Sequence, residues 1–228
     1  MQALRFNTFG QIHKGLRALL YDTALMIQHT NFTRDDETRA VVERVGLVER
    51  LFESHAHIED SEIFPMVASH APEVVADFEA QHDEDHRLSE DLKRQLEKFV
   101  ETNSAEQNQA YGWELMQQFN AFLAFNVEHM RKEETIVNDL LWQHYSDAEL
   151  LGKVESISAS IPPEKNVHYA EWMLRGMAVH EITCWLSNVR HHAPPPVFDM
   201  LIGIAESVLP ADRWSAVRDG LMEGALLA

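Results

Sequence analysis

The stretch FNAFLAFNVEHMRKEETIVNDL, residues 119–140, carries the clearest structural pattern in this chain. Its stripe steps by three and four residues, through Phe119, Phe122, Asn126, His129, Glu133, Ile136 and Leu140. Such spacing places side chains on one face of an α-helix, the face that packs into a core. His129 and Glu133 interrupt this apolar face, and burying them is costly unless another group pairs with them. A metal ion would be such a partner, so the stripe predicts a buried helix that carries two metal ligands.

The composition indicates a helical globular protein. Hydrophobic residues make up 45% of the 228 residues, which is enough for a core. Glycine and proline are few, and no run alternates between apolar and polar residues as a half-buried strand does. The formal net charge of −18 repels nucleic acid phosphates and anionic lipid headgroups. We therefore expect no nucleic acid partner and no membrane partner.

A cytoplasmic location is expected from three features. Cys184 is the single cysteine, so the chain forms no internal disulfide. The N-terminal segment MQALRFNTFG lacks the apolar run of a secretory signal. No stretch reaches the roughly 18 apolar residues that a membrane-spanning helix needs.

Helical periodicity and capping signals divide residues 1–145 into four long helices. They are expected at about residues 8–30, 37–64, 73–101 and 104–145. Pro65 is expected to end the second helix, and Ser104 with Gln107 forms a capping-box pattern for the fourth. Short connections favour antiparallel neighbours, so the fold class is all-α, an up-down-up-down four-helix bundle.

Polar residues on the inner faces gather at one end of this predicted bundle. His13 and His82 lie early in the first and third helices. His55 and His129 lie late in the second and fourth, which places them at the same level. The full inward set is His13, His55, Glu59, His82, His86, His129 and Glu133. Five imidazoles and two carboxylates are enough to hold two metal ions, with the carboxylates bridging them.

Several polar residues lie close to this set in the sequence. His57, Asp60 and Glu134 lie off the apolar stripes, which favours a solvated face for them. Glu62 lies on the stripe of the second helix. It is therefore a reserve ligand, or a hydrogen-bond acceptor for one.

Four motifs resemble those of the hemerythrins and the hemerythrin-like HHE cation-binding proteins, over about residues 8–145. They are IHKGLR with His13, HAHIEDSEIFP with His55 and Glu59, QHDEDHR with His82 and His86, and EHMRKEE with His129 and Glu133. The resemblance implies a four-helix bundle of hemerythrin type. It also implies a cofactor of two iron ions, a di-iron centre with a bridging oxo or hydroxo group that binds O2.

The same resemblance implies the ligand assignment. His82, His86 and His129 would hold one iron ion. His13 and His55 would hold the other, and Glu59 and Glu133 would bridge them. In the oxygen-carrying hemerythrins the last carboxylate is an Asp five residues after its His, whereas here Glu133 follows His129 by four. That is the spacing of the HHE branch, which includes oxygen sensors, nitric-oxide-responsive proteins and iron-handling proteins.

We expect a metal- and gas-binding protein rather than an enzyme, because no general base, nucleophile or substrate pocket is visible in the sequence. Its small ligand would be O2 or NO, and its role sensing, storage or delivery. An alternative is an iron-handling or redox enzyme, either peroxide- or NO-reducing or an iron-donating repair protein. A third reading is a structural protein that binds zinc or no metal.

The pattern changes after residue 145, which divides the chain into predicted domains at 1–145 and 146–228. Five helices are expected in the C-terminal extension, at about 146–160, 164–176, 179–191, 197–209 and after Pro210. Their many aromatic and aliphatic residues require burial. We expect them to pack on the bundle or to form the interface of a homodimer, and no catalytic motif is present among them.

Overall fold

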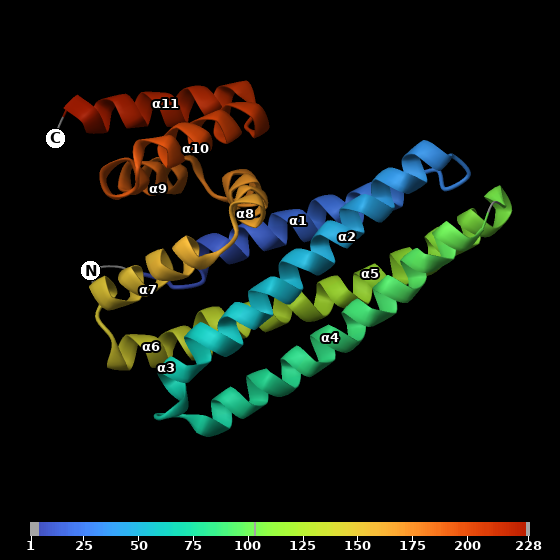
Figure 1. Ribbon diagram of the computed structural model, residues 1–228, viewed down its shortest axis with the longest axis horizontal. Helices are drawn as coiled ribbons and strands as arrows, with labels where there is room; N and C mark the ends of the chain where they lie inside the picture. The colour runs from blue at the N-terminus through green and yellow to red at the C-terminus, as the bar shows by residue number, and fades with distance from the viewer. Residues whose placement is uncertain (1–4, 103, 227–228) are drawn as a thin grey trace. The chain divides into compact units, whose positions relative to one another are not determined.

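The computed structural model of the protein describes residues 5–102 and 104–226. Residues 1–4 of the first predicted domain, residue 103 in the expected connection and residues 227–228 of the second domain lie outside the described residues. In the described part every regular element is helical and no strand occurs (Figure 1). The predicted all-α class is therefore confirmed.

The N-terminal two thirds of the chain form long helices at the predicted positions, together with three shorter ones. They are α1 (Gly10–His29), α2 (Asp35–Ile58), α3 (Phe64–Ala68), α4 (Pro72–Glu101), α5 (Ala105–Lys132), α6 (Asn138–His144) and α7 (Asp147–Ser160). Two π-helical turns, η1 (Glu59–Ile63) and η2 (Glu133–Val137), join α2 to α3 and α5 to α6. The Ser104 side chain accepts a hydrogen bond from the backbone N–H of Gln107 at 3.3 Å and so caps α5, as the sequence predicts.

The chain divides into two compact units. The first comprises Met1–Phe9 and Leu19–Ser160, and the second comprises Gly10–Ala18 and Ile161–Ala228. Helix α1 therefore contributes residues to both units, and α7 belongs to the first. The predicted domain division at residue 145 remains a prediction, and these units differ from it at α1 and at α7.

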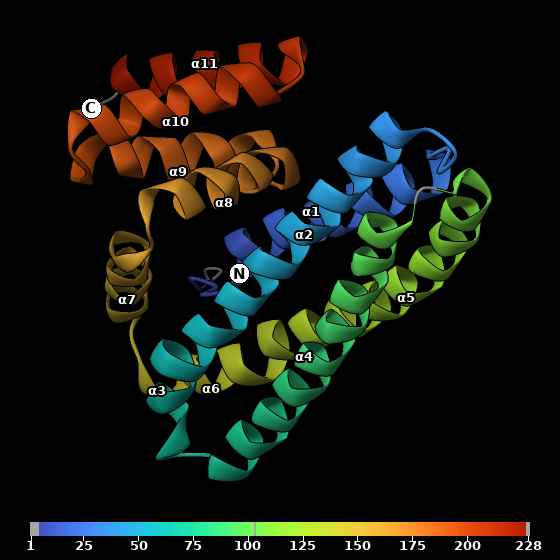
Figure 2. The same cartoon turned by 45° about the vertical axis from the view of Figure 1, so that its right-hand side comes forward.

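In the first unit, α4 and α5 lie side by side, as both views show, and α2 packs along α4 (Figures 1 and 2). The inner face of α4 follows a four-three alternation. Its buried residues include Val75, Phe78, His82, Asp85, Ser89, Leu92, Leu96 and Phe99. One face of a straight helix thus supplies both apolar core and polar groups, and this places His82 beside the polar residues of α2 and α5.

Both π-helical turns begin at the carboxylate of a His-x-x-x-Glu pair. The backbone N–H of Phe64 donates to the carbonyl of Glu59, and that of Asn138 donates to the carbonyl of Glu133, each five residues earlier. A π turn contains one residue more than an α turn. The side chains that follow it are therefore rotated by about 100° relative to a continuous α-helix.

This rotation overturns part of the predicted stripe in residues 119–140. Ile136 was expected to face the core but is 45% exposed, and Val137 and Leu141 are the fully buried residues. Leu140, which was also expected there, is partly buried and packs against the core. The expectation that Pro65 ends the second helix is also wrong. Pro65 lies in the first turn of α3, where no backbone N–H is needed, and the helix runs on to Ala68.

The second unit contains four of the five helices predicted in the C-terminal extension. They are α8 (Pro163–Gly176), α9 (Val179–His192), α10 (Pro195–Val208) and α11 (Ala211–Leu226). Their contacts pair α8 with α10 and α9 with α11. The core they enclose is made of Ala170, Leu174, Met177, Ile182, Leu186, Leu201, Ala205, Leu209, Trp214, Val217 and Leu221. These residues account for much of the apolar surface that the sequence required to be buried, and the homodimer remains a prediction.

Glycine allows two helices of the second unit to touch through their backbones. A Cβ atom added to Gly176 of α8 would lie 2.2 Å from the carbonyl oxygen of Lys14 in α1. We expect Gly176→Ala to lower the free energy of unfolding by about 1–3 kcal/mol, because a backbone carbonyl cannot turn away as a side chain can. Chemical denaturation measures this. Gly203→Ala is the matched control, since no atom lies within 4 Å of its added Cβ, and an equal loss there would contradict the assignment.

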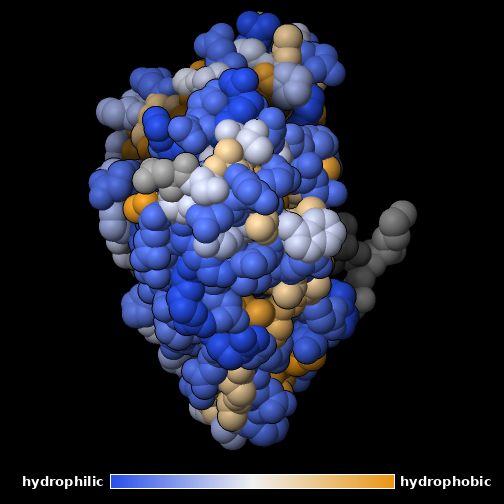
Figure 3. All heavy atoms as spheres, turned by 90° about the vertical axis from the view of Figure 1, so that its right-hand side faces the viewer, coloured by the Kyte–Doolittle hydropathy of each residue, from blue (hydrophilic) through white to orange (hydrophobic). Residues whose placement is uncertain are grey.

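The exposed surface is largely polar on the face that Figure 3 shows, with scattered apolar residues among hydrophilic ones. This agrees with the excess of acidic residues over basic ones. Among the described helices, none has both the length and the apolar character needed to cross a membrane.

Candidate metal centre

Two helix segments each place a histidine and a glutamate at the centre of the first unit. His55 lies in the last turn of α2 and Glu59 begins η1, while His129 lies in the last turn of α5 and Glu133 begins η2. His82 comes from α4. All five side chains are buried, so the sequence has placed imidazoles and carboxylates in a core, where they need partners.

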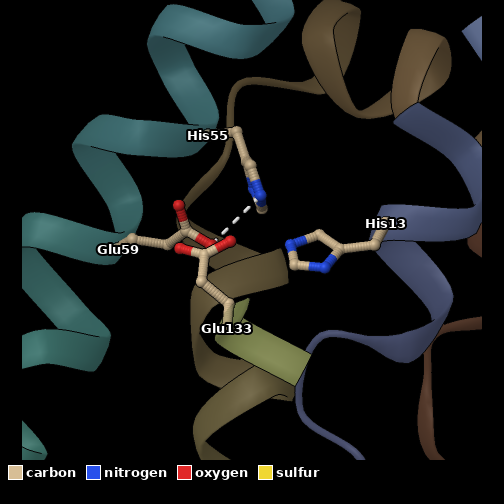
Figure 4. A group of neighbouring side chains, drawn as sticks. All are labelled: His13, His55, Glu59 and Glu133. Carbon is tan, nitrogen blue, oxygen red and sulfur yellow. Dashed lines mark ion pairs between the residues drawn. The ribbon is translucent and has the colours of Figure 1, made fainter. Parts of the chain in front are cut away.

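Figure 4 shows the first of two donor groups, formed by His13, His55, Glu59 and Glu133. The two carboxylates face one another and both imidazoles point toward them. One potential ligand atom from each residue lies within 4.8 Å of the others. Nε2 of His55 is 3.1 Å from Oε1 of Glu59.

The second group contains Glu59, His82, His129 and Glu133, with the same spread of ligand atoms. Nε2 of His82 lies 3.1 Å from Nε2 of His129. Nε2 of His129 lies 3.2 Å from Oε1 of Glu133. Both groups thus use the same two carboxylates, Glu59 and Glu133, with a different pair of imidazoles on each side.

The donor set fits metal ions. Imidazole nitrogens with carboxylate oxygens suit iron, zinc and similar divalent ions. Two nitrogens that bind one ion at about 2.1 Å, at roughly a right angle, lie about 3 Å apart. The 3.1 Å between the Nε2 atoms of His82 and His129 has this value. Six of the seven predicted ligands fall into the two groups.

The electrostatics of the site also favour a cation. Burial, and then the neighbouring Glu59 carboxylate, raise the pKa of Glu133 well above its ordinary value. Burial alone would lower the pKa of His82, but Glu59 and Asp60 outweigh it and raise that pKa to about 8. Without a cation, the raised pKa values of Glu133 and His82 favour the protonated forms of these side chains. A metal ion would take the place of these protons.

The structure does not bring His86 to the centre. The four-three alternation of α4 runs from His82 through Asp85 and Ser89, which leaves His86 on the adjacent, exposed face. Asp85 is buried in its stead. His86 is exposed and belongs to neither donor group, so its role as an iron ligand stays a prediction.

A buried polar pair beside the centre was missed by the sequence reasoning. The Asn126 side chain donates hydrogen bonds to Oδ1 of Asp85 at 2.6 Å and to the carbonyl of Phe122 at 3.2 Å. Burial raises the pKa of Asp85, and the hydrogen bond from Asn126 opposes that shift. The signal was present, since Asn126 lies on the stripe of α5 and Asp85 lies on that of α4.

Two residues outside the apolar stripes, Asp60 and Gln81, contact the Nδ1 atoms of His82 and His129. Asp60, for which a solvated face was expected, has a side chain that is 44% exposed, and its Oδ1 lies 2.8 Å from Nδ1 of His82. Oε1 of Gln81 lies 3.4 Å from Nδ1 of His129. The sequence pattern of a single helix could not predict either contact, because each contact joins side chains of two different helical segments.

Glu62, the expected reserve ligand, does not reach the centre. Its side chain is 44% exposed and forms an ion pair with Lys153 of α7. The π turn η1 explains the difference, since the extra residue rotates Glu62 outward and brings Ile63 into the core.

Aromatic rings fix the imidazoles of the second group. The ring of Phe64 stacks on His82, with centroids 5.3 Å apart, and Phe125 stacks on His129 at 6.0 Å. Phe78 lies at 5.6 Å from His129. These contacts exclude water from one side of each ring and restrict its rotation.

A small cavity of about 10 Å³ adjoins the second group, close to the smallest volume that holds a water molecule. Its lining comprises Phe52, His55, Ala56, Glu59, His82, Asp85, Asn126, His129 and Met130. An open hollow of about 420 Å³ lies beside it, between α2 and α4. The two share Ala56, His82 and Asp85 as lining residues, so these side chains lie between the cavity and the hollow.

Fold and donor set together define an all-helical protein with a buried histidine and carboxylate centre able to hold metal ions. The family model of the Hemerythrin HHE cation binding domain matches residues 6–141. This span is more than half of the chain, and the protein belongs to that family, as the four motifs predicted. No curated protein and no solved structure matches the chain significantly.

Proposed function

We propose that this protein holds two iron ions in an up-down-up-down four-helix bundle and binds O2 or NO there. His13 and His55 would hold one ion. His82 and His129 would hold the other, with Glu59 and Glu133 shared between them. The gas would be bound for sensing, storage or delivery.

The observation that carries this proposal is the pair of donor groups that share both carboxylates. A single ion would need only one of them. Two imidazoles on each side of two buried carboxylates supply separate nitrogen ligands for two ions, and bridging oxygen ligands for both. Family membership supports a cation as the ligand, and the donor types are those that iron accepts.

Iron would supply the gas-binding chemistry, and the residues of the chain hold and shield it. The cavity of about 10 Å³ has room for a molecule the size of water. Phe52, Ala56 and Met130 make part of its wall apolar, as suits a small neutral gas. The Asp85 and Asn126 pair adds polar groups that could meet the outer atom of such a ligand.

One observation favours a redox enzyme as the second candidate. Asp85 lines both the cavity and the open hollow, and a carboxyl group in that place could pass protons from solvent to a small substrate. Reduction of peroxide or of NO consumes protons, whereas reversible gas binding needs none. The free thiol of Cys184 is compatible with the reducing cytoplasm in which either activity would operate.

Metal analysis and optical spectroscopy test the proposal. Protein purified under reducing conditions should contain about two iron ions per chain. Exposure of the anaerobic ferrous protein to O2 or NO should produce a charge-transfer band, and this band should disappear when the gas is removed.

Three other outcomes would redirect the assignment. Irreversible conversion to a ferric spectrum, with turnover of added peroxide or NO, would select the redox enzyme. Iron stoichiometry without a gas response would indicate iron handling. Protein that takes up no iron when loaded anaerobically would contradict both candidates and leave a zinc-binding or structural role.

A further inference from the structure

The contact between Asp60 and His82 fixes which imidazole nitrogen faces the centre. Oδ1 of Asp60 lies 2.8 Å from Nδ1 of His82. A carboxylate accepts hydrogen bonds, so Nδ1 carries the proton in this pair. The lone pair of a neutral imidazole is then on Nε2, which lies 3.1 Å from Nε2 of His129 and 3.5 Å from Oε2 of Glu59.

The two imidazoles of the second donor group are supported unequally. Nδ1 of His129 faces the neutral amide oxygen of Gln81 at 3.4 Å, and that oxygen also lies 3.4 Å from Nζ of Lys132. A hydrogen bond to a carboxylate at 2.8 Å is roughly twice as strong as one between neutral groups. His82 is therefore the more firmly oriented ring, and its Nε2 is the more basic donor.

We propose that Asp60 is a positioning residue of the metal centre, which holds the His82 ring with Nε2 directed at a bound cation and strengthens that ligand. This inference rests on the proposed metal site. The position of Asp60 in η1 supports it, because the residue directly follows Glu59. The π turn η1 thereby supplies the Glu59 carboxylate to the centre and the Asp60 carboxylate to Nδ1 of His82, the ring nitrogen that points away from the centre.

Partial exposure does not make Asp60 an ordinary surface acid. Its side chain is 44% exposed and lines the open hollow. Asp83 of α4 lines the same hollow and is exposed. The two aspartates carry equal charge near the centre, yet only the first is within hydrogen-bonding distance of His82. Asp83 is therefore a matched control that separates hydrogen bonding from charge.

The test compares Asp60→Ala, Asp60→Asn, Asp60→Glu and Asp83→Asn in the full chain. Fe²⁺ affinity is measured anaerobically by competition with a chelator, and Zn²⁺ affinity is measured as a redox-inert check. We expect Asp60→Ala to weaken binding by about 10- to 100-fold, the usual effect of losing such a partner. Asp60→Asn should fall between Ala and wild type, Asp60→Glu should recover part of the affinity, and Asp83→Asn should stay within about twofold.

A second measurement does not depend on metal. The ¹⁵N chemical shifts of the His82 ring in the metal-free protein at pH 9 report its tautomer. Wild type should carry the proton on Nδ1, whereas Asp60→Ala should show a mixture of the two tautomers. This readout would also show whether the variant remains folded, since the other histidine signals should keep their positions.

The affinities and the tautomer of His82 separate a failure of the positioning role from a failure of the metal site. If Asp60→Ala retains wild-type affinity, or if Asp83→Asn weakens binding equally, the positioning role is wrong and the centre stands. An unchanged tautomer in Asp60→Ala would also overturn the role. If the wild-type protein binds neither Fe²⁺ nor Zn²⁺, the proposed function fails, and the part of the inference that concerns a bound cation fails with it.

Discussion

Replacement of His129 with Ala is expected to reduce the iron content from two ions per chain to one or none. His129 contributes Nε2 to the group that contains His82, Glu59 and Glu133. Its removal leaves one imidazole for that ion, together with two carboxylates already shared with the other ion. The substitution also removes the imidazole that stacks on Phe125. Iron per chain, after anaerobic loading and desalting, is the measurement.

His57→Ala is the matched control for this experiment. His57 is exposed, lies two residues from His55 and lines the open hollow rather than the small cavity. It should retain wild-type iron content and the wild-type spectrum. A His129→Ala protein that still holds two ions would show that the assignment of nitrogen ligands is wrong, and helical content measured by circular dichroism would show whether the fold survives.

Glu133→Gln is expected to have opposite effects on the metal-free and the metal-loaded protein. Without metal, the variant should be more stable than wild type by about 1–3 kcal/mol at pH 8, because Gln removes a carboxyl group whose charged form is disfavoured by burial and by Glu59. With metal, the order should reverse. A bound ion stabilises the wild-type fold by about 2.7 kcal/mol at a free concentration of one hundred times Kd, and the variant lacks a shared ligand for both ions.

The pH dependence of the metal-free protein follows from the raised pKa of Glu133. Burial and the nearby Glu59 carboxylate raise that pKa in the folded state. The folded protein therefore keeps a proton that the unfolded chain releases above its ordinary value of about 4.3. Unfolding releases this proton, so wild-type stability falls as pH rises from that value through the raised pKa. The stabilisation by Glu133→Gln should accordingly be larger at pH 8 than at pH 5.

Denaturant titrations at pH 5 and pH 8, with a chelator and then with saturating metal, measure both effects. Glu128→Gln provides the control on the same helix, because Glu128 is exposed and pairs with Arg131. It should change stability by less than about 1 kcal/mol in either state. A metal-free Glu133→Gln protein that is less stable than wild type at pH 8 would show that the two carboxylates are well compensated without a cation.

Local periodicity carried most of the fold. The stripes of α2, α4 and α5 predicted the helices and the buried positions, because the apolar residues of an amphipathic helix recur every three or four positions on the face that packs inward. The same spacing selected His55 over His57, and Glu133 over Glu134, for the centre. The capping residue Ser104 and the proline boundary before α8 likewise acted through their immediate neighbours.

Periodicity failed where the helix itself departs from α geometry. The sequences of η1 (EDSEI) and η2 (EETIV) contain no signal that predicts a π turn. An uninterrupted α-helix was therefore assumed, which placed Glu62 and Ile136 on the core side. A π turn is retained when surrounding packing and ligand positions compensate for its weaker hydrogen bonding. That compensation comes from other helices and is not encoded in the five residues concerned.

Spacing within single helices was enough to predict the helical class, the positions of the long helices and the inward faces of the six residues at the centre. Packing between helices decided that Asp85 rather than His86 faces inward and that Asp60 lies against His82. It also decided that α1 contributes to two compact units. These features depend on which helices pack against one another and on how each helix is rotated about its axis. A contact between residues distant in sequence does not change the spacing of apolar residues in either helix, so the spacing cannot predict it.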